Sequence, residues 1–250
     1  MKDIVSSWFK SLQKEICLNL ESLENQAVLN KDQFQAKKFA FKDWIRAEGG
    51  GGKMGILRGG RVFEKAGVNF SLVHGQFSSE FAYKIPGADK DPTFWASGIS
   101  IVIHPRSPLV PIVHMNTRMI ITTKTWFGGG IDLTPVYPID EDTDFFHSQI
   151  KNTCDQFDTT YYNQFKKSCD EYFYIHHRNE PRGVGGIFYD NLNSGNINQD
   201  FEFTKAIGRL FTNVYRPIVQ KHFNKPWGMQ EIQDQLYKRT KYTEFNLKIG

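Results

Sequence analysis

Cysteine is scarce in this chain, and its three copies, Cys17, Cys154 and Cys169, lie far apart in the sequence. An odd number of widely spaced cysteines does not form a disulfide framework, and it favours a reduced, cytoplasmic protein with small buried thiols. Neither a Cys-x-x-Cys pair nor a His-Glu-x-x-His motif is present, so the spacing indicates no zinc site.

Long apolar runs are also absent. No segment approaches the length of a membrane span, and the first residues, Met1 to Ile4, lack the apolar core of a signal peptide. The formal net charge of +4 is small, and the basic residues are scattered along the chain. This pattern argues against a nucleic-acid partner, although it suits a small anionic ligand.

Apolar residues are present in sufficient number for a core, since 40% of the 250 residues are hydrophobic and 14% are aromatic. The chain has no break in composition, so we expect residues 1–250 to form a single domain. A stripe from Ile4 through Leu12 to Leu23 predicts a helix over 3–27. Apolar residues at helical spacing predict further helices over 145–157, 160–173, 201–223 and 227–239. Alternating residues predict strands over 34–47, 61–75, 99–104, 113–119, 120–127, 183–192 and 242–247.

No regular alternation of strands and helices appears, and neither a dinucleotide-binding glycine fingerprint nor an internal repeat is visible. The inventory therefore predicts an α+β fold with a large, mainly antiparallel sheet flanked by helices on both sides.

The stretch from Phe94 to Arg118 carries the most chemistry. It predicts two neighbouring strands joined by a proline-rich turn, with isoleucines alternating against polar residues. If the strands pair, one face of the sheet holds Ser100, His104, His114, Asn116 and Arg118. This face is either the solvated side of a half-buried sheet or a site for binding and proton transfer.

Two glycine-rich stretches allow more than one interpretation. Gly49 to Gly52 does not match the phosphate-binding P-loop pattern, so a mobile loop and a loop that closes over a ligand remain open. Gly128 to Gly130 precede Asp132 at the expected end of a strand. That aspartate is either a turn or cap residue or a carboxylate held close to a ligand.

Four blocks of sequence are similar to the oxygen-dependent coproporphyrinogen III oxidase family. They are GRVFEKAGVN at 60–69, GIS to HMNTR at 98–118, WFGGGIDLTP at 126–135 and HRNEPRGVGGIF at 177–188. The resemblance runs in order along nearly the whole chain. It implies a large antiparallel sheet flanked by helices, and a homodimer.

The same resemblance implies a reaction. Two propionates of coproporphyrinogen III would be oxidatively decarboxylated to vinyl groups, giving protoporphyrinogen IX in haem biosynthesis. Molecular oxygen would be the co-substrate, and no organic cofactor would be needed.

The resemblance also implies roles for individual residues. His114 would be the proton donor, and Asp132 would hold or activate the substrate together with Arg182. The residues that match substrate-binding positions of the family are Ser100, Asn116, Thr117, Arg118 and Arg182. The histidines that match a possible divalent metal site are His104, His114, His147 and His177; taken alone, His147 is more typical of a surface or core histidine.

The family continues beyond the strand expected at 242–247, with a segment that carries a substrate contact and much of the dimer interface. We therefore expect the chain to be C-terminally truncated relative to the family, with an unpaired sheet edge and a weakened dimer. The alternative to the oxidase is a tetrapyrrole-binding protein with weak or no turnover. A metal-dependent oxygenase or hydrolase is a third hypothesis, which the dispersed histidines do not support.

Overall fold

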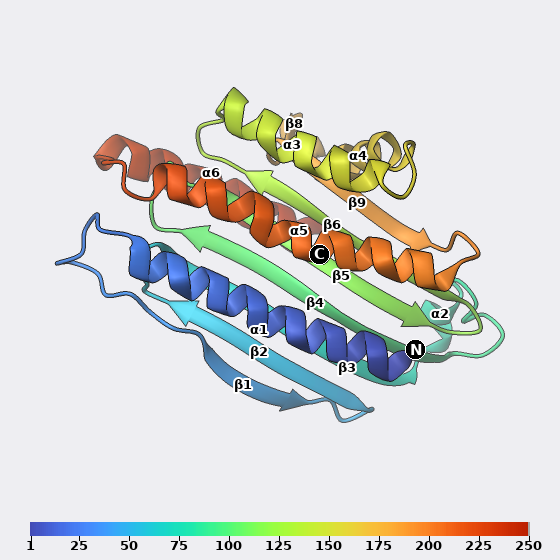
Figure 1. Cartoon of the computed structure of the whole chain (residues 1–250). Coiled ribbons are helices and arrows are strands. Elements are labelled where there is room, and N and C mark those ends of the chain that lie inside the picture. Colours follow the sequence, from blue (N-terminus) through green and yellow to red (C-terminus); the bar gives the residue numbers. More distant parts are fainter. Residues whose placement is uncertain (250) are drawn as a thin grey trace.

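A seven-stranded antiparallel sheet forms the centre of the molecule in the computed structural model, which describes residues 1–249 (Figure 1). The strand order is β1-β2-β3-β4-β5-β6-β9, so neighbouring strands are also neighbours in the chain except at β9. The strands are β1 (Ala40–Ile45), β2 (Gly50–Arg58), β3 (Phe63–Gln76), β4 (Thr93–Pro105), β5 (Ile112–Ile121), β6 (Thr125–Thr134) and β9 (Gly185–Leu192). A separate two-stranded hairpin pairs β7 (Tyr174–Ile175) with β8 (Glu180–Pro181).

Helices precede, interrupt and follow these strands in the described part of the chain. They are α1 (Lys2–Gln26), α2 (Ser79–Ala82), α3 (Asp140–Asp155), α4 (Tyr161–Tyr172), the short 3-10 helix η1 (His176–Arg178), α5 (Ile197–His222) and α6 (Met229–Ile249). The predicted α+β fold is confirmed. Among residues 1–249, no helix combines the length and apolar character that a membrane span requires.

One face of the sheet forms the core with α1 and α5. Ile99, Ile101 and Ile103 of β4 are buried there, because alternate residues of a strand point to the same side. Gln13 of α1 donates to the backbone carbonyl of Val68 at 2.8 Å, which fixes the helix against the sheet. The buried stripe of α1 begins at Val5, whereas Ile4, which the sequence pattern placed in it, is 64% exposed.

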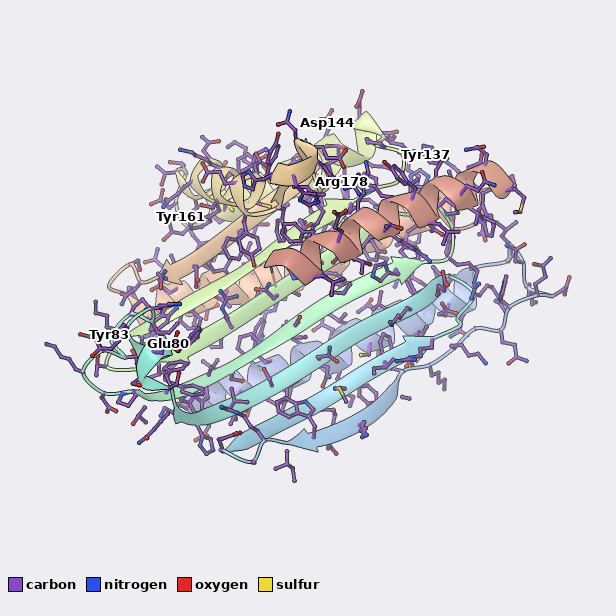
Figure 2. All side chains as sticks on the ribbon, turned by 180° about the vertical axis from the view of Figure 1, so that it is seen from behind. Glu80, Tyr83, Tyr137, Asp144, Tyr161 and Arg178 are labelled. Atoms are coloured by element: carbon purple, nitrogen blue, oxygen red, sulfur yellow. The ribbon has the colours of Figure 1, made fainter. Side chains whose placement is uncertain are left out.

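The opposite face of the sheet is covered by α6 and, beside it, by Phe173 and Arg182 next to the β7–β8 hairpin. Figure 2 shows α6 crossing in front of the strands while α1 lies behind them. Arg239 of α6 bonds to Glu64 of β3 at 2.7 Å and to the carbonyl of Pro105 at 2.7 Å. Tyr137, which precedes α3, donates to Asp234, about one turn closer to the start of the helix. These polar contacts hold α6 over the ends of β3 and β4.

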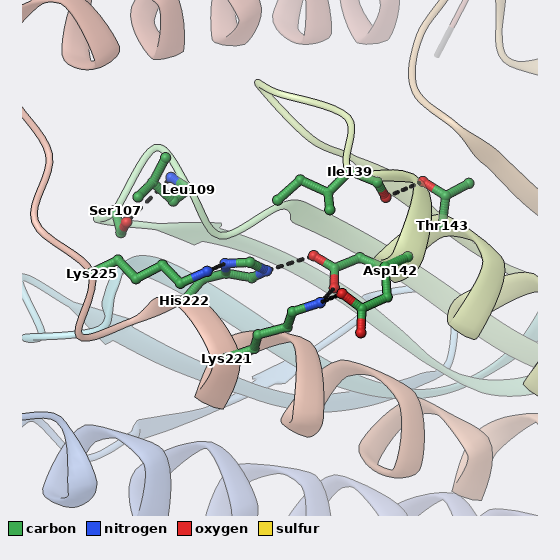
Figure 3. A network of polar contacts seen from close by, with 9 residues as sticks. Ser107, Leu109, Ile139, Asp142, Thr143, Lys221, His222 and Lys225 are labelled. Atoms are coloured by element: carbon green, nitrogen blue, oxygen red, sulfur yellow. Dashed lines mark hydrogen bonds and ion pairs between the residues drawn. The ribbon is translucent and has the colours of Figure 1, made fainter.

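A polar network joins the start of α3 to the end of α5 (Figure 3). Asp142 accepts from His222 at 2.5 Å and from Lys221 at 2.8 Å. Burial alone raises the pKa of Asp142, but the hydrogen bonds from Lys221 and His222 outweigh it and hold the pKa below its usual value. The network aligns the two helices that flank β6 and β9.

Three expectations about secondary structure are wrong. The strand expected over 120–127 is instead the end of β5, a turn at 122–124 and the start of β6. Gly50 to Gly52 belong to strand β2 and not to a loop, and only Gly49 lies in the turn before it. A Cβ atom on Gly52 would lie 2.2 Å from the carbonyl oxygen of Phe70, so close backbone packing explains the glycines there.

Residues 242–247, expected as a strand, belong to helix α6. Tyr242 and Phe245 are both buried and lie three residues apart, which is the spacing of one helical face. The unpaired edge expected at this strand therefore does not exist.

Glu24, near the end of α1, is a buried carboxylate that anchors the helix to the turn before β3. It is 0% exposed and accepts four backbone N–H bonds. The donors are Lys37 at 3.1 Å, Arg61 at 2.7 Å, Val62 at 2.9 Å and Phe63 at 2.7 Å.

We expect Glu24→Gln to lower the free energy of unfolding by about 2–4 kcal/mol, because the amide NH₂ would face backbone donors and leave them unsatisfied. Urea unfolding followed by circular dichroism measures the change. Glu15→Gln, at an exposed position of the same helix, is the matched control and should cost less than about 0.5 kcal/mol. Equal effects of the two substitutions would show that Glu24 is no anchor.

Candidate active site

The face of the sheet beneath α6 gathers the polar residues that the sequence pattern placed together. In the register of the strands, Ser100 lies opposite Asn116, Val102 lies opposite His114, and His114 in turn lies opposite Asp132. His104 lies an even number of residues from Ser100 on β4, and Arg118 lies an even number from His114 on β5, so both share this face. The prediction of a shared polar face is confirmed.

Asp132 lies within β6, which four strands separate from the edge strand β1 and which pairs with β9. The expectation that it follows a strand end, as a turn or cap residue, is wrong. Gly128, Gly129 and Gly130 belong to the same strand. Because β6 pairs with β5 on one side and β9 on the other, its glycines let the neighbouring backbones approach closely. A Cβ atom on Gly130, for example, would lie 2.4 Å from the carbonyl oxygen of Ile187.

A continuous chain of hydrogen bonds runs through the site. The Arg182 guanidinium donates to Oδ2 of Asp132 at 2.7 Å, and His114 Nδ1 bonds to Oδ1 at 2.9 Å. The other ring nitrogen of His114, Nε2, lies 3.2 Å from the side-chain amide nitrogen of Asn116. Arg118 donates to Oδ1 of Asn116 at 3.1 Å. Five side chains from β5, β6 and the segment before β9 are thus linked end to end.

The direction of each bond in this chain follows from the arginine. A guanidinium can only donate, so the Asn116 oxygen faces Arg118 and its NH₂ group faces His114. His114 Nε2 therefore accepts, which places the proton on Nδ1, where it is donated to Asp132. Since Nδ1 is bonded to Asp132, a His114 that donates a proton to substrate would need a hydrogen on Nε2. That hydrogen would point at the NH₂ group of Asn116, which is also a donor.

Asp132 is 2% exposed and Arg182 is 3% exposed, so both charges are buried. Burial by itself raises the pKa of Asp132, but the charge of Arg182 and the hydrogen bond from His114 outweigh it and leave the pKa below its usual value. The carboxylate is thus held ionised. A buried pair of this kind is strongly destabilised when one partner is removed.

Aromatic rings enclose the guanidinium of Arg182. Its central carbon lies 3.7 Å from the ring centroid of Phe173, 4.7 Å from that of Tyr242 and 4.9 Å from that of Phe245. Planar guanidinium groups stack well on such rings. Two of these rings belong to α6, so the helix completes the environment of the charged pair.

A cavity of 240 Å³ lies between this face of the sheet and α6. Its lining residues come from β4, β5, β9, α4, α6 and the segments that flank the β7–β8 hairpin; they are Ser100, Val102, His114, Asn116, Arg118, Tyr172, Phe173, Arg182, Phe188, Tyr242 and Phe245. A groove of 720 Å³ lies on the other face, beside α1, and its charged groups are only Lys10, Lys14, Lys53 and Asp43. We take the smaller cavity as the candidate site because the linked donors and acceptors converge there.

Thr117 does not share this cavity. Its side chain points to the opposite face, is 0% exposed, and has no hydrogen-bond partner at Oγ1. A role in substrate binding through this side chain is therefore not compatible with the structure.

The four histidines matched to a metal site are not brought together. His147 lies on α3, with Nε2 2.9 Å from the carbonyl of Val184 and Nδ1 3.0 Å from the Tyr162 hydroxyl. His177 pairs with Glu244 of α6 at 2.5 Å. In the part of the chain that the structure describes, no three His, Cys, Asp or Glu side chains form a group that could hold a metal ion. The donor set does not fit a shared metal.

Several residues of the site were not foreseen from the sequence. Phe188 and Asp190 lie on the site face of β9. They alternate with the buried Ile187 and Tyr189, and this alternation could have predicted that they point away from the core. Tyr242 and Phe245 were hidden by the wrong assignment of the C-terminal segment as a strand.

Comparison with known proteins gives a consistent result. The model of the coproporphyrinogen III oxidase family matches residues 4–250. A Rickettsia felis protein named oxygen-dependent coproporphyrinogen-III oxidase is 51% identical over 246 residues, which cover 98% of this chain and 88% of that protein. Proteins of the same name from Rickettsia africae and Rickettsia bellii are each 50% identical over the same shares.

The partly buried ring of His104, beside the cavity, makes the stability of the fold depend on pH. Burial lowers the pKa of His104 to about 4, and the positive charges of Arg239 and Lys65 add to this, while Glu64 opposes it. Its Nδ1 atom is buried without a partner, and its ring meets Tyr242 edge to face at 5.4 Å.

Because the folded pKa lies below the usual value of 6.5, the unfolded chain binds a proton first as the pH falls. We therefore expect the free energy of unfolding to decrease between pH 6.5 and 4, by at most about 3 kcal/mol from this residue. The difference between wild type and His104→Gln in urea unfolding at several pH values isolates that contribution. Parallel pH curves for the two proteins would refute it.

Proposed function

Because the chain belongs to the coproporphyrinogen III oxidase family, we propose that it converts two propionates of coproporphyrinogen III to vinyl groups, with molecular oxygen as oxidant and no organic cofactor. The product would be protoporphyrinogen IX. The observation that carries this proposal is the linked set Arg118–Asn116–His114–Asp132–Arg182. It connects the cations and the histidine that line the cavity to a buried, ionised carboxylate directly behind them.

The reaction needs the groups that this cavity offers. Each propionate that becomes a vinyl group loses CO₂, a proton and two electrons, so that two such groups supply the four electrons that reduce O₂ to two waters. Arg118 has the fork of N–H donors that binds a carboxylate. The macrocycle also carries four pyrrole N–H groups, which call for a carboxylate acceptor; Asp132 is the carboxylate behind the cavity wall, held by His114 and Arg182.

Asp132 has a second use in the same scheme. Removal of electrons from the pyrrole system leaves positive charge on the ring, and a fixed carboxylate in a water-poor cavity stabilises such charge. His114 is held by Asp132 on one side, and its Nε2 lone pair, which the Asn116 amide occupies here, can accept a proton. Ser100 is exposed at the edge of the cavity, which supports a contact with the rim of the substrate.

Two further features belong to the proposal. A homodimer is supported by the uncovered strand β1, where Phe41 is 49% and Ile45 is 90% exposed. A cytoplasmic location is supported by the three free cysteines, all of which are buried. A divalent metal is not part of the proposed mechanism, because three of the four histidines that would hold it, His114, His147 and His177, bind other groups.

An aerobic assay that follows vinyl-group formation from coproporphyrinogen III tests the function. Turnover that requires O₂ and releases CO₂ is the expected result. Tight binding of coproporphyrinogen without turnover would instead support a tetrapyrrole-binding protein, and the absence of both would reject the proposal.

We expect Asp132→Asn to lower kcat by about 100-fold or more, because the amide keeps the shape of the side chain but not its negative charge. The rate is expressed per folded molecule, determined by circular dichroism at a temperature where the variant is folded, because loss of the buried pair also lowers stability. Asp155→Asn, which removes a charge from a partly exposed pair with Lys151 far from the site, is the control. Nearly full turnover by folded Asp132→Asn would make this residue structural.

A further inference from the structure

Arg118, which the proposed function assigns to a substrate carboxylate, is already paired with a carboxylate of its own chain. Its guanidinium lies 3.1 Å from Oδ1 of Asp190, and the two side chains are 30% and 41% exposed. The other end of the guanidinium donates to Asn116. The arginine that lines the cavity is therefore held at both ends.

The pair spans a strand. Arg118 belongs to β5 and Asp190 to β9, with β6 between them. The guanidinium crosses β6 above Gly128, where a Cβ atom would lie 2.8 Å from the Asp190 oxygen and 3.1 Å from the guanidinium carbon. Any other residue at this position would displace the pair, so the backbone is arranged to let it form.

Asp190 is also oriented by its own backbone. The same Oδ1 atom accepts from the N–H of Asn191 at 3.0 Å, and Asn191 has a positive φ of 56°. A bulge within β9, with Asn191 in the left-handed conformation that asparagine tolerates, thus aims the carboxylate back over the sheet. The missing side chain at Gly128 and the bulge that faces it on β9 together make room for one ion pair.

We propose that Asp190 is the resident counter-ion of Arg118: a substrate propionate displaces it on binding, and it takes Arg118 back once that propionate has left as CO₂. This inference rests on the proposed function. It follows from charge, because two carboxylates that share one guanidinium repel each other, whereas a neutral vinyl group does not compete for it.

Asp190 then makes the site discriminate against ligands that keep a carboxylate at Arg118. It weakens the binding of every ligand that presents a carboxylate to Arg118, and it leaves the binding of a ligand with a vinyl group there unchanged. The loss of CO₂ thereby removes the contact that holds this side of the ring, and Arg118 returns to Asp190 as the ring is released or turned.

The test is equilibrium binding without oxygen, with coproporphyrinogen III as the tetracarboxylate and protoporphyrinogen IX as the dicarboxylate. We expect Asp190→Asn to tighten coproporphyrinogen III binding about twofold to fivefold, the range that an exposed ion pair is worth. Protoporphyrinogen IX binding should change by less than about twofold. Asp155→Asn, with the same change in net charge, should alter neither.

A double-mutant cycle makes the test specific to this pair. In an Arg118→Ala background, Asp190→Asn should have no effect on either ligand. Unchanged or weaker coproporphyrinogen III binding by Asp190→Asn alone overturns the inference, as does equal tightening for both ligands or tightening that persists without Arg118. If the wild-type chain binds neither porphyrinogen, the proposed function itself fails, which is a different result from any of these.

Discussion

A buried carboxylate organises the polar face of this sheet. Asp132 lies within β6, is shielded from water, and accepts from Arg182 on one oxygen and from His114 on the other. A buried charge is tolerated only when it is paired and hydrogen-bonded, so the positions of both partners are determined by it. The orientation of His114 in turn determines that of Asn116, and Asn116 determines one end of Arg118.

Helix α6 is the second constraint, because it separates this charged chain from water. Its Tyr242 and Phe245 rings pack on Arg182, while Arg239 and Glu244 attach the helix to β3 and to η1. A low local dielectric strengthens each hydrogen bond beneath the helix. The open end of the cavity, near Ser100 and Arg118, is where charge remains accessible to a ligand.

Much of this arrangement could be predicted from the sequence, and the exceptions have physical causes. The alternation in β4 and β5 placed His114, Asn116 and Arg118 on one face, since strand periodicity is a local property. Asp132 was misplaced because three glycines resemble a turn, whereas they belong to a strand packed closely on both sides. The segment 242–247 was misassigned because a short aromatic run fits a strand or a helix face equally well. Asp190 could not be linked to Arg118, since their contact depends on the register of two further strands.

The hydrogen-bond chain from Arg182 to Arg118 depends most directly on the position of one proton. Nitrogen-15 chemical shifts of the His114 ring, recorded at pH 8 on labelled protein and assigned by comparison with His114→Gln, report which ring nitrogen carries it. We expect a protonated Nδ1 and an unprotonated Nε2, as the bonds from Asp132 through to Arg118 require. A ring with its proton on Nε2 would contradict the account, because it cannot donate to Asp132 while accepting from Asn116.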